Sequence, residues 1–175
     1  MPQPRGQGFV LQSKVNADHV ADTVTRRSKN GFLVYLSCAN VYWFSKKQTS
    51  VESSSFGSEF VAMKQCCEYL QGLHYNLQMM GIPCEGPAYI SGDNQSVLAN
   101  TAIPDSTLKN NSQSIAYHFI REGSARDKWR ASYGNTHDNK ANLLTKLFHS
   151  SEKRNRLHHI FQTNAAAASI KWGVH

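Results

Sequence analysis

The sequence lacks the segments that would carry the chain into or through a membrane. No apolar run approaches the roughly 20 residues that span a bilayer. The N-terminal Met1-Pro2-Gln3-Pro4-Arg5 has no apolar segment of the kind found in a secretory signal. We therefore expect an intracellular protein, cytoplasmic or nuclear, that is not secreted and has no membrane partner.

Cysteine is scarce, and its spacing excludes two kinds of covalent or metal scaffold. The four cysteines are Cys38, Cys66, Cys67 and Cys84, none of which has CxxC spacing, and the adjacent pair cannot easily close on itself. A disulfide framework and a structural zinc site are both disfavoured. We expect reduced thiols, mostly in the core.

Acidic residues are the minority charge. Twelve Asp and Glu stand against nineteen Lys and Arg, which gives a net charge of +7 and a sequence pI near 9.3. Such a balance favours an anionic partner, most commonly nucleic acid, although a basic protein without that role is the alternative. The 175 residues, 40% of them hydrophobic, fit one folded α/β or α+β domain.

Hydrophobic periodicity predicts the order of the elements. Strands are expected at 9–18, 32–36 and 41–44, then at 88–90 and 129–133. A long amphipathic helix is expected at 56–80, because apolar residues recur there at spacings of three, four and seven. Shorter helices are expected at 95–100, 113–122, 138–148 (with Thr136 as N-cap) and 151–161.

This order predicts an α/β fold with a mixed five-stranded sheet, three antiparallel strands followed by parallel ones, flanked by helices. Residues 1–8, rich in Gly, Pro and Gln, are interpreted as a flexible arm or a linker remnant. We expect the folded domain to span 9–150, and a basic helix and tail to occupy 151–175.

Acids or amides stand at strand ends and helix starts in four segments. These are Asn16-Ala17-Asp18, Glu59, Asp93 and the stretch 139–142. Such positions can converge on one site for a hard divalent cation. Taken singly, each is more simply explained as a turn residue or as an acid at a helix N-terminus.

The amino-acid sequence around these positions resembles that of one protein family. Ser45-Lys46-Lys47-Gln48, followed by a Glu59-bearing helix, resembles the corresponding turn and helix in copia-type polyproteins. Gly92-Asp93-Asn94 is similar to the family's Asp-Asn motif, and residues 117–122 to its His-Phe-Arg helix. Residues 141–146 are similar to its closing Ala-Asp-x-x-Thr-Lys. With the first-strand motif, five motifs follow in family order over about 14–148, so the chain resembles the ribonuclease H domain that follows the reverse transcriptase in a copia-type retrotransposon Gag-Pol polyprotein.

The resemblance implies a ribonuclease H-like fold and a metal-dependent endonuclease that hydrolyses the RNA strand of an RNA–DNA hybrid. In the family, four carboxylates hold two Mg²⁺ (or Mn²⁺) ions, about 4 Å apart. The implied partners are RNA–DNA hybrid or other duplex nucleic acid and the reverse transcriptase part of the parent polyprotein. The implied location includes a cytoplasmic virus-like particle.

Two of the four implied catalytic positions carry an amide in place of a carboxylate. Glu59 and Asp93 match family acids and are expected to be catalytic residues and metal ligands. Asn16 and Asn142 stand where the family has aspartate. Because two negative charges are removed from a site for two dications, we expect weakened metal binding and impaired or lost hydrolysis.

Two alternatives stay open at this point. Asp18, on the same strand face as Asn16, and Asp138, one helical turn before Asn142, are possible substitutes that would keep the nuclease working. Strand rise displaces the carboxylate of Asp18 by roughly 6 to 7 Å, too far for unchanged metal geometry. The other alternative is a non-catalytic interaction module that does not bind nucleic acid.

Basic residues near the predicted element ends form a candidate nucleic-acid-binding surface. Aromatic residues, Tyr42, Trp43 and Trp129, lie near them in the sequence, as a surface that follows phosphates requires. A solvated charged face is the simpler reading. The six basic residues are Lys46, Lys47, Arg121, Arg126, Lys128 and Arg130.

Overall fold

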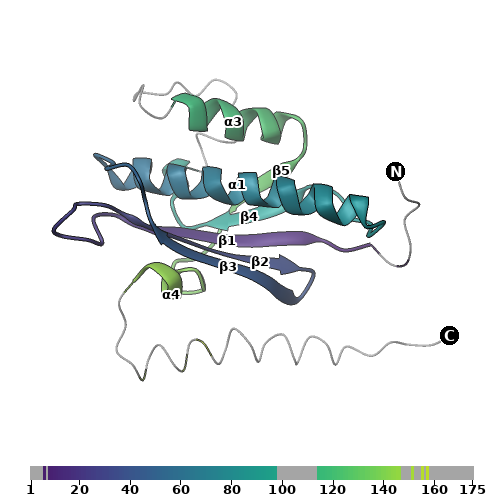
Figure 1. The fold of residues 1–175 in the computed structure, drawn as a ribbon, viewed down its shortest axis with the longest axis horizontal. Helices are drawn as coiled ribbons and strands as arrows, with labels where there is room; N and C mark the ends of the chain where they lie inside the picture. The colour runs from purple at the N-terminus through teal and green to yellow at the C-terminus, as the bar shows by residue number, and fades with distance from the viewer. Residues whose placement is uncertain are drawn as a thin grey trace.

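A five-stranded mixed sheet forms the centre of the molecule (Figure 1). The computed structural model describes residues 6, 8–97, 114–146, 151, 155 and 157. The strands are β1 (Leu11–Asp18), β2 (Lys29–Leu36), β3 (Ala39–Lys47), β4 (Ala88–Gly92) and β5 (Trp129–Tyr133). The helices are α1 (Ser55–Met79), α3 (Ser114–Ala125) and α4 (Asn142–Thr145).

The sheet order is β3-β2-β1-β4-β5, and it confirms the predicted topology. β1 pairs antiparallel with β2, and β2 pairs antiparallel with β3. β4 pairs parallel with β1, and β5 parallel with β4. β1 therefore lies between the antiparallel and the parallel parts of the sheet.

Helices cover the two faces of the sheet unequally. In Figure 1, α1 crosses one face with α3 beyond it, and α4 lies on the opposite face. On β1 the buried residues Leu11, Val15 and Ala17 belong to the core between the sheet and α1. Because side chains alternate along a strand, Lys14, Asn16 and Asp18 face the α4 side.

The long helix α1 agrees with its sequence pattern. Its N-cap is Ser54, whose hydroxyl accepts a 3.1 Å hydrogen bond from the Gly57 N–H. The apolar positions of the predicted stripe are all buried: Phe60, Met63, Cys67, Leu70 and Leu77. The prediction of reduced cysteines is also consistent with the structure, where the four are free and the adjacent pair is buried in the core.

The predicted late helix is wrong in its first part. Residues 136–141 form turns, and the described helix covers only Asn142–Thr145, with no side-chain hydrogen bond at its N-cap position, Ala141. Two side-chain hydrogen bonds stabilise the non-helical conformation of this loop. Asn142 Nδ2 donates to the Thr136 carbonyl at 2.7 Å, and Asn139 Nδ2 donates to the Val15 carbonyl at 2.9 Å. Thr136 is therefore a loop residue and not the predicted cap.

Several predictions fall partly or wholly outside the described residues. These are most of the arm at 1–8, residues 98–100 of the helix expected at 95–100, most of the helix expected at 151–161, and the domain limits at 9–150 and 151–175. No helix in the described part of the chain has the length and apolarity needed to span a membrane.

Candidate active site

Two carboxylates meet where β4 ends and α1 begins. Asp93 follows β4 directly, and Glu59 lies in the second turn of α1. Burial, together with the nearby Asp93 carboxylate, raises the pKa of Glu59 to about 7, against the opposing effects of an Asn94 hydrogen bond and the Lys146 charge. The turn after Asp93 is fixed because Asn94 Oδ1 accepts hydrogen bonds from the N–H groups of Ser96 and Val97, at 3.0 and 3.2 Å.

Asn16 reaches the same end of the sheet through β1. The parallel register pairs Lys14 with Ser91, so Asn16 and Asp93 each lie two residues further along neighbouring strands. The side chain of Asn16 is buried, with the residue 3% exposed, and Asn16 Nδ2 donates to Thr145 Oγ1 on α4 at 2.5 Å. The sheet and α4 are therefore joined through this amide.

Asn142 begins α4 beside this contact. It is also 3% exposed, and Thr145 Oγ1 donates to its carbonyl at 3.3 Å. The hydrogen bond from Asn142 Nδ2 to the Thr136 carbonyl fixes the orientation of the side-chain amide, and with it the position of Oδ1. That oxygen is buried and has no hydrogen-bond partner among the described residues.

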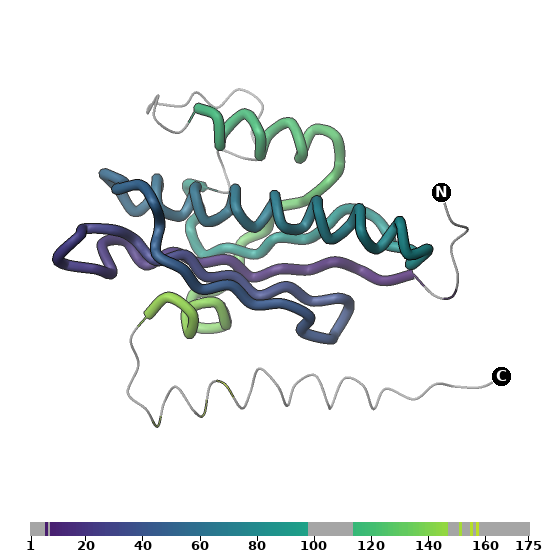
Figure 2. The backbone as a smooth tube through the Cα atoms, in the orientation of Figure 1, coloured from purple at the N-terminus to yellow at the C-terminus, as the bar shows by residue number. Residues whose placement is uncertain are grey.

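The four matched positions thus come from four elements to one end of the sheet. Figure 2 shows the start of α1, the end of β1 and α4 gathered toward this end. We call Asn16, Glu59, Asp93 and Asn142 the four-residue site.

Some residues that build the site were missed at the sequence level. Gly31 is the Cα partner of Asn16 on β2, and a Cβ there would lie 2.7 Å from Leu144 Cβ and 2.8 Å from Thr145 Cγ2. Its missing side chain lets α4 approach the sheet. Thr145 and Lys146 lie inside the Thr-Lys part of the last motif, which was the available signal for both.

The donor set of the four-residue site fits one divalent cation better than two. Mg²⁺ prefers oxygen ligands, and Glu59, Asp93 and the unpartnered amide oxygen of Asn142 supply that chemistry. Two carboxylates balance the charge of one dication only. Within the described ranges no cluster of three or more His, Cys, Asp or Glu is arranged to hold a metal.

The two proposed substitutes differ in their placement. Asp18 is half-buried, on the same strand face as Asn16, and is the Cα partner of Lys29. Asp138 is exposed in the turn before α4, so the expectation that it precedes Asn142 by one helical turn is wrong. Its backbone carbonyl accepts a 2.9 Å hydrogen bond from Lys14 Nζ.

The six basic residues do not form the single surface that the sequence suggested. Lys46 and Lys47 end β3, at the end of the sheet that holds the four-residue site. Lys128 and Arg130 lie at the start of β5, which pairs with the start of β4 and is therefore at the opposite end. A role in nucleic-acid binding stays a prediction for each residue separately.

Most of these cations already have partners. Lys47 pairs with Asp22 at 2.6 Å, Arg126 with Glu122 at 2.8 Å and Arg130 with Asp127 at 2.8 Å. Arg121 bonds to the Tyr117 hydroxyl and lies 5.0 Å from that ring's centroid.

Of the three nearby aromatic residues, only one could stack on a ligand without rearrangement. Trp43 is 63% exposed, whereas Trp129 is buried at 2%. Tyr42 stacks on Tyr69, with ring centroids 4.0 Å apart.

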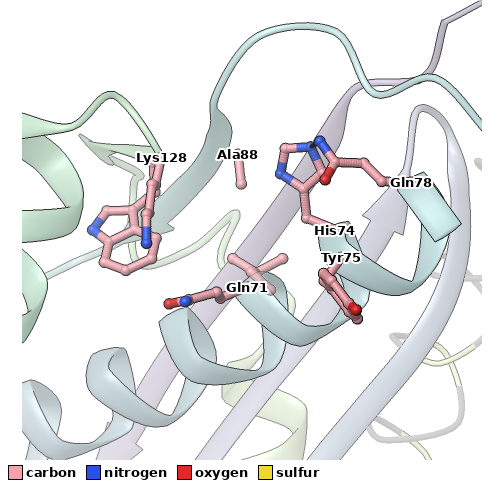
Figure 3. Close-up of a pocket in the computed structure, with 8 residues that line it drawn as sticks. Gln71, His74, Tyr75, Gln78, Ala88 and Lys128 are labelled. Atoms are coloured by element: carbon pink, nitrogen blue, oxygen red, sulfur yellow. Dashed lines mark hydrogen bonds between the residues drawn. The ribbon is translucent and has the colours of Figure 1, made fainter. Parts of the chain in front are cut away.

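A cavity of about 300 Å³ beside the second half of α1 lies away from the four-residue site. Figure 3 shows Gln71, His74 and Gln78 on α1, with Ala88 and Lys128 at the starts of β4 and β5. Because those strand starts are opposite Asp93, this cavity is not part of the candidate active site.

Comparison with known proteins gives relatives for most of the chain. The retrovirus-related Pol polyprotein from transposon RE2 of Arabidopsis thaliana is 32% identical over 142 residues, and that from transposon RE1 of the same plant is 31% identical over 142 residues. Each match covers 81% of this chain, which spans only 10% of the length of either relative. No protein-family model matches.

Solved structures with the same fold include ribonucleases H and a viral protease-reverse transcriptase, all at low sequence identity. The N-terminal RNase H domain of Rv2228c from Mycobacterium tuberculosis has a TM-score of 0.57 at 9% identity, covering 93% of this chain and 100% of that one. LC11-RNase H1, crystallised in complex with RNA/DNA hybrid, has a TM-score of 0.57 at 11% identity, covering 78% and 93%. A foamy viral protease-reverse transcriptase, in complex with RNA/DNA hybrid, has a TM-score of 0.51 at 13% identity, covering 83% of this chain and 21% of that one.

Proposed function

We propose that this chain, a homologue of the Pol polyproteins of plant copia-type transposons with a ribonuclease H fold, binds RNA–DNA hybrid at the end of the sheet that carries Glu59 and Asp93. Support comes from the net charge of +7 and from two structures of the same fold that were solved with such a hybrid. Lys46, exposed at the same end of the sheet, is positioned to contact a phosphate there.

We further propose that hydrolysis of the RNA strand is impaired or lost. The observation that carries this proposal is the bonding of Asn142, whose amide NH₂ donates to a carbonyl in a buried site. An ionised carboxylate could not make that bond. The surroundings of position 142 therefore suit a neutral hydrogen-bond donor, whereas two-metal hydrolysis requires an anionic metal ligand at this position.

One Mg²⁺ or Mn²⁺ ion would be held by the carboxylates of Glu59 and Asp93, with the Asn142 amide oxygen as an uncharged third ligand. Such an ion, when bound, would polarise a phosphodiester oxygen. The pKa of Glu59, raised to about 7 in the metal-free protein, means that a proton and the ion would compete for this carboxylate near neutral pH. Lys146 supplies a positive charge close to Glu59, which favours a phosphate nearby.

We also propose a reverse transcriptase partner within one polyprotein, a ribonuclease H-like domain at 9–150 and a cytoplasmic or nuclear location. The polyprotein setting is supported by the Pol polyprotein relatives, of whose length this chain spans 10%.

Cleavage of a labelled RNA–DNA hybrid in Mg²⁺ tests the loss of hydrolysis. The comparison is between the unaltered chain and the Asn16→Asp/Asn142→Asp double variant. We expect the unaltered chain to cleave at least about 100-fold more slowly, the effect of roughly 2.7 kcal/mol in the barrier. Adding Glu59→Gln to the double variant should abolish its activity and excludes a contaminating nuclease.

Equal cleavage by the unaltered chain and the double variant would contradict the proposed loss. It would favour a working site completed by Asp18, which Asp18→Asn in the unaltered chain would then abolish. Hybrid binding is measured separately, as affinity against salt concentration. Absence of binding at low salt would instead favour an interaction module.

A further inference from the structure

A second pocket opens on the sheet face that α1 does not cover. Its volume is about 360 Å³, and it lies next to the four-residue site, toward the starts of β1 and β4. None of its described lining residues is acidic. The lining side chains that carry the argument are Lys14, Tyr35, Tyr89, Ser91, Ser132 and Lys140.

Strand register places most of these side chains on one face. Gln12 is the Cα partner of Tyr35 on β2 and of Tyr89 on β4. In the next row, Lys14 is the partner of Ser91, and Ser91 is the partner of Ser132 on β5. Because Cα partners point to the same face, the side chains of these two rows, including Lys14, lie on one face of the sheet.

The loop before α4 brings a second lysine to the pocket. Asn139 Nδ2 donates to the Val15 carbonyl at 2.9 Å, and Lys14 Nζ donates to the Asp138 carbonyl at 2.9 Å. These two bonds hold residues 138 and 139 against β1. Lys140 follows directly and lines the same cavity as Lys14.

Tyr35 gives an independent sign of a ligand. The residue is 8% exposed, and its hydroxyl group is buried without a hydrogen-bond partner among the described residues. A buried polar group left in this state costs about 1 to 3 kcal/mol. The cost is removed if a bound oxyanion accepts a hydrogen bond from it.

We propose that this pocket binds a phosphoryl group. Lys14 and Lys140 supply positive charge, and the hydroxyls of Tyr35, Ser91 and Ser132 are the hydrogen-bond donors. The ligand is a small phosphate, such as inorganic phosphate or a nucleotide 5′-phosphate, or a backbone phosphate of a nucleic acid. The pocket lacks the carboxylates of the four-residue site and does not depend on hydrolysis or on hybrid binding there.

Thermal unfolding and calorimetric titration of the full chain test this pocket, with inorganic phosphate and adenosine 5′-monophosphate as the small probes and chloride at equal ionic strength as the reference. We expect both probes to raise the unfolding temperature above that in chloride. Tyr35→Phe and Lys140→Gln should each weaken phosphate binding about tenfold, the effect of losing one charge-assisted hydrogen bond.

Two features of these variants separate a binding role from a structural one. Tyr35→Phe removes a hydroxyl that has no hydrogen-bond partner in the described part of the chain, so the variant should be at least as stable as the unaltered chain in chloride. Lys64→Gln removes one charge from α1, where Lys64 pairs with Glu68 at 2.7 Å, and is the matched control for Lys140→Gln. The control should leave phosphate binding unchanged.

A short RNA–DNA hybrid distinguishes the source of the phosphate. If Tyr35→Phe weakens binding of the small probes alone, the pocket takes a free phosphate; if it weakens hybrid binding as well, the pocket takes a backbone phosphate. Either result supports the proposal. If neither Tyr35→Phe nor Lys140→Gln alters binding of the small probes or the hybrid, the proposal is overturned, whatever the fate of the four-residue site.

Discussion

Asn16 on β1 donates its amide hydrogen to the hydroxyl of Thr145 on α4, 129 residues further along the chain. Thr145 in turn donates to the carbonyl of Asn142. The side chain of Asn16 is therefore linked through one threonine to the backbone of Asn142, and this chain of hydrogen bonds holds α4 against the sheet.

Asn142→Asp should destabilise the fold when no divalent cation is present. The variant loses the hydrogen bond to the Thr136 carbonyl and places a buried carboxylate against that oxygen, a cost of about 1 to 3 kcal/mol. Mg²⁺ should restore part of the loss. Urea unfolding with and without Mg²⁺ measures both effects.

Asn135→Asp is the matched control for that change. Asn135 is exposed, and its Oδ1 accepts from the His137 N–H at 3.0 Å, a role that a carboxylate can keep. We expect a change within about 0.5 kcal/mol. An Asn142→Asp variant as stable as this control without Mg²⁺ would contradict the assignment of the amide as a required donor.

Gly31→Ala should displace α4. The added Cβ would meet Leu144 and Thr145 at 2.7 and 2.8 Å, and such overpacking costs about 1 to 3 kcal/mol. Gly72→Ala is the control, because nothing lies within 4 Å of its Cβ position on α1. The control should be neutral or stabilising by up to about 1 kcal/mol. Equal stability of the two variants in urea unfolding would show that α4 does not pack at Gly31.

Glu59→Gln should stabilise the metal-free protein at high pH. The raised pKa of Glu59 means that the folded chain binds this proton more tightly than the unfolded chain does. The contribution of this proton to the free energy of unfolding is fully present below about pH 4.5 and is lost as the pH rises to about 7. Between these values the variant should gain about 1 to 2 kcal/mol relative to the unaltered chain, after allowance for solvent screening.

The pH profile is measured by urea unfolding in a chelating buffer. Glu68→Gln, on the exposed side of the same helix, is the control and should change the profile by less than about 0.5 kcal/mol. If the difference in unfolding free energy between Glu59→Gln and the unaltered chain does not change with pH, Glu59 is not held beside Asp93 in a half-buried site.

Much of the architecture could be predicted from sequence, because its signals are local. β5 (Trp129–Tyr133) was predicted to the residue, and α1 within one residue at each end, since each has a clear hydrophobic period. The first part of the late helix was predicted wrongly because two asparagine side chains donate hydrogen bonds that no local pattern reveals. Asn139 donates to the Val15 carbonyl on β1, and Asn142 donates to the Thr136 carbonyl in the preceding loop.

The candidate site could be predicted only in part. Its four positions were found through motifs, and the sheet order then brought them together. Lys46 and Lys47 were grouped with Lys128 and Arg130, although the two pairs lie at opposite ends of the sheet, because nearness to an element end does not say which end of the sheet that is. Lys128 precedes a strand parallel to β4 and so lies opposite Asp93.

Lys46 and Lys128 should differ in their effect on hybrid binding. Lys46 lies near the end of β3, at the end of the sheet that holds the four-residue site, whereas Lys128 directly precedes β5 at the other end of the sheet. Lys46→Gln should weaken hybrid binding and reduce the salt slope by about one unit, as expected for one lost phosphate contact. Lys128→Gln should change neither. A larger effect at Lys128 would place the hybrid on the opposite end of the domain.

The number of divalent ions that the chain binds shows directly whether the two amides have reduced a two-ion site to a one-ion site. Mn²⁺ titration followed by electron paramagnetic resonance counts the bound ions in the unaltered chain and in the Asn16→Asp/Asn142→Asp variant. We expect at most one bound ion in the unaltered chain at Mn²⁺ concentrations that load two ions into the variant. Two ions bound with equal affinity in both proteins would contradict it.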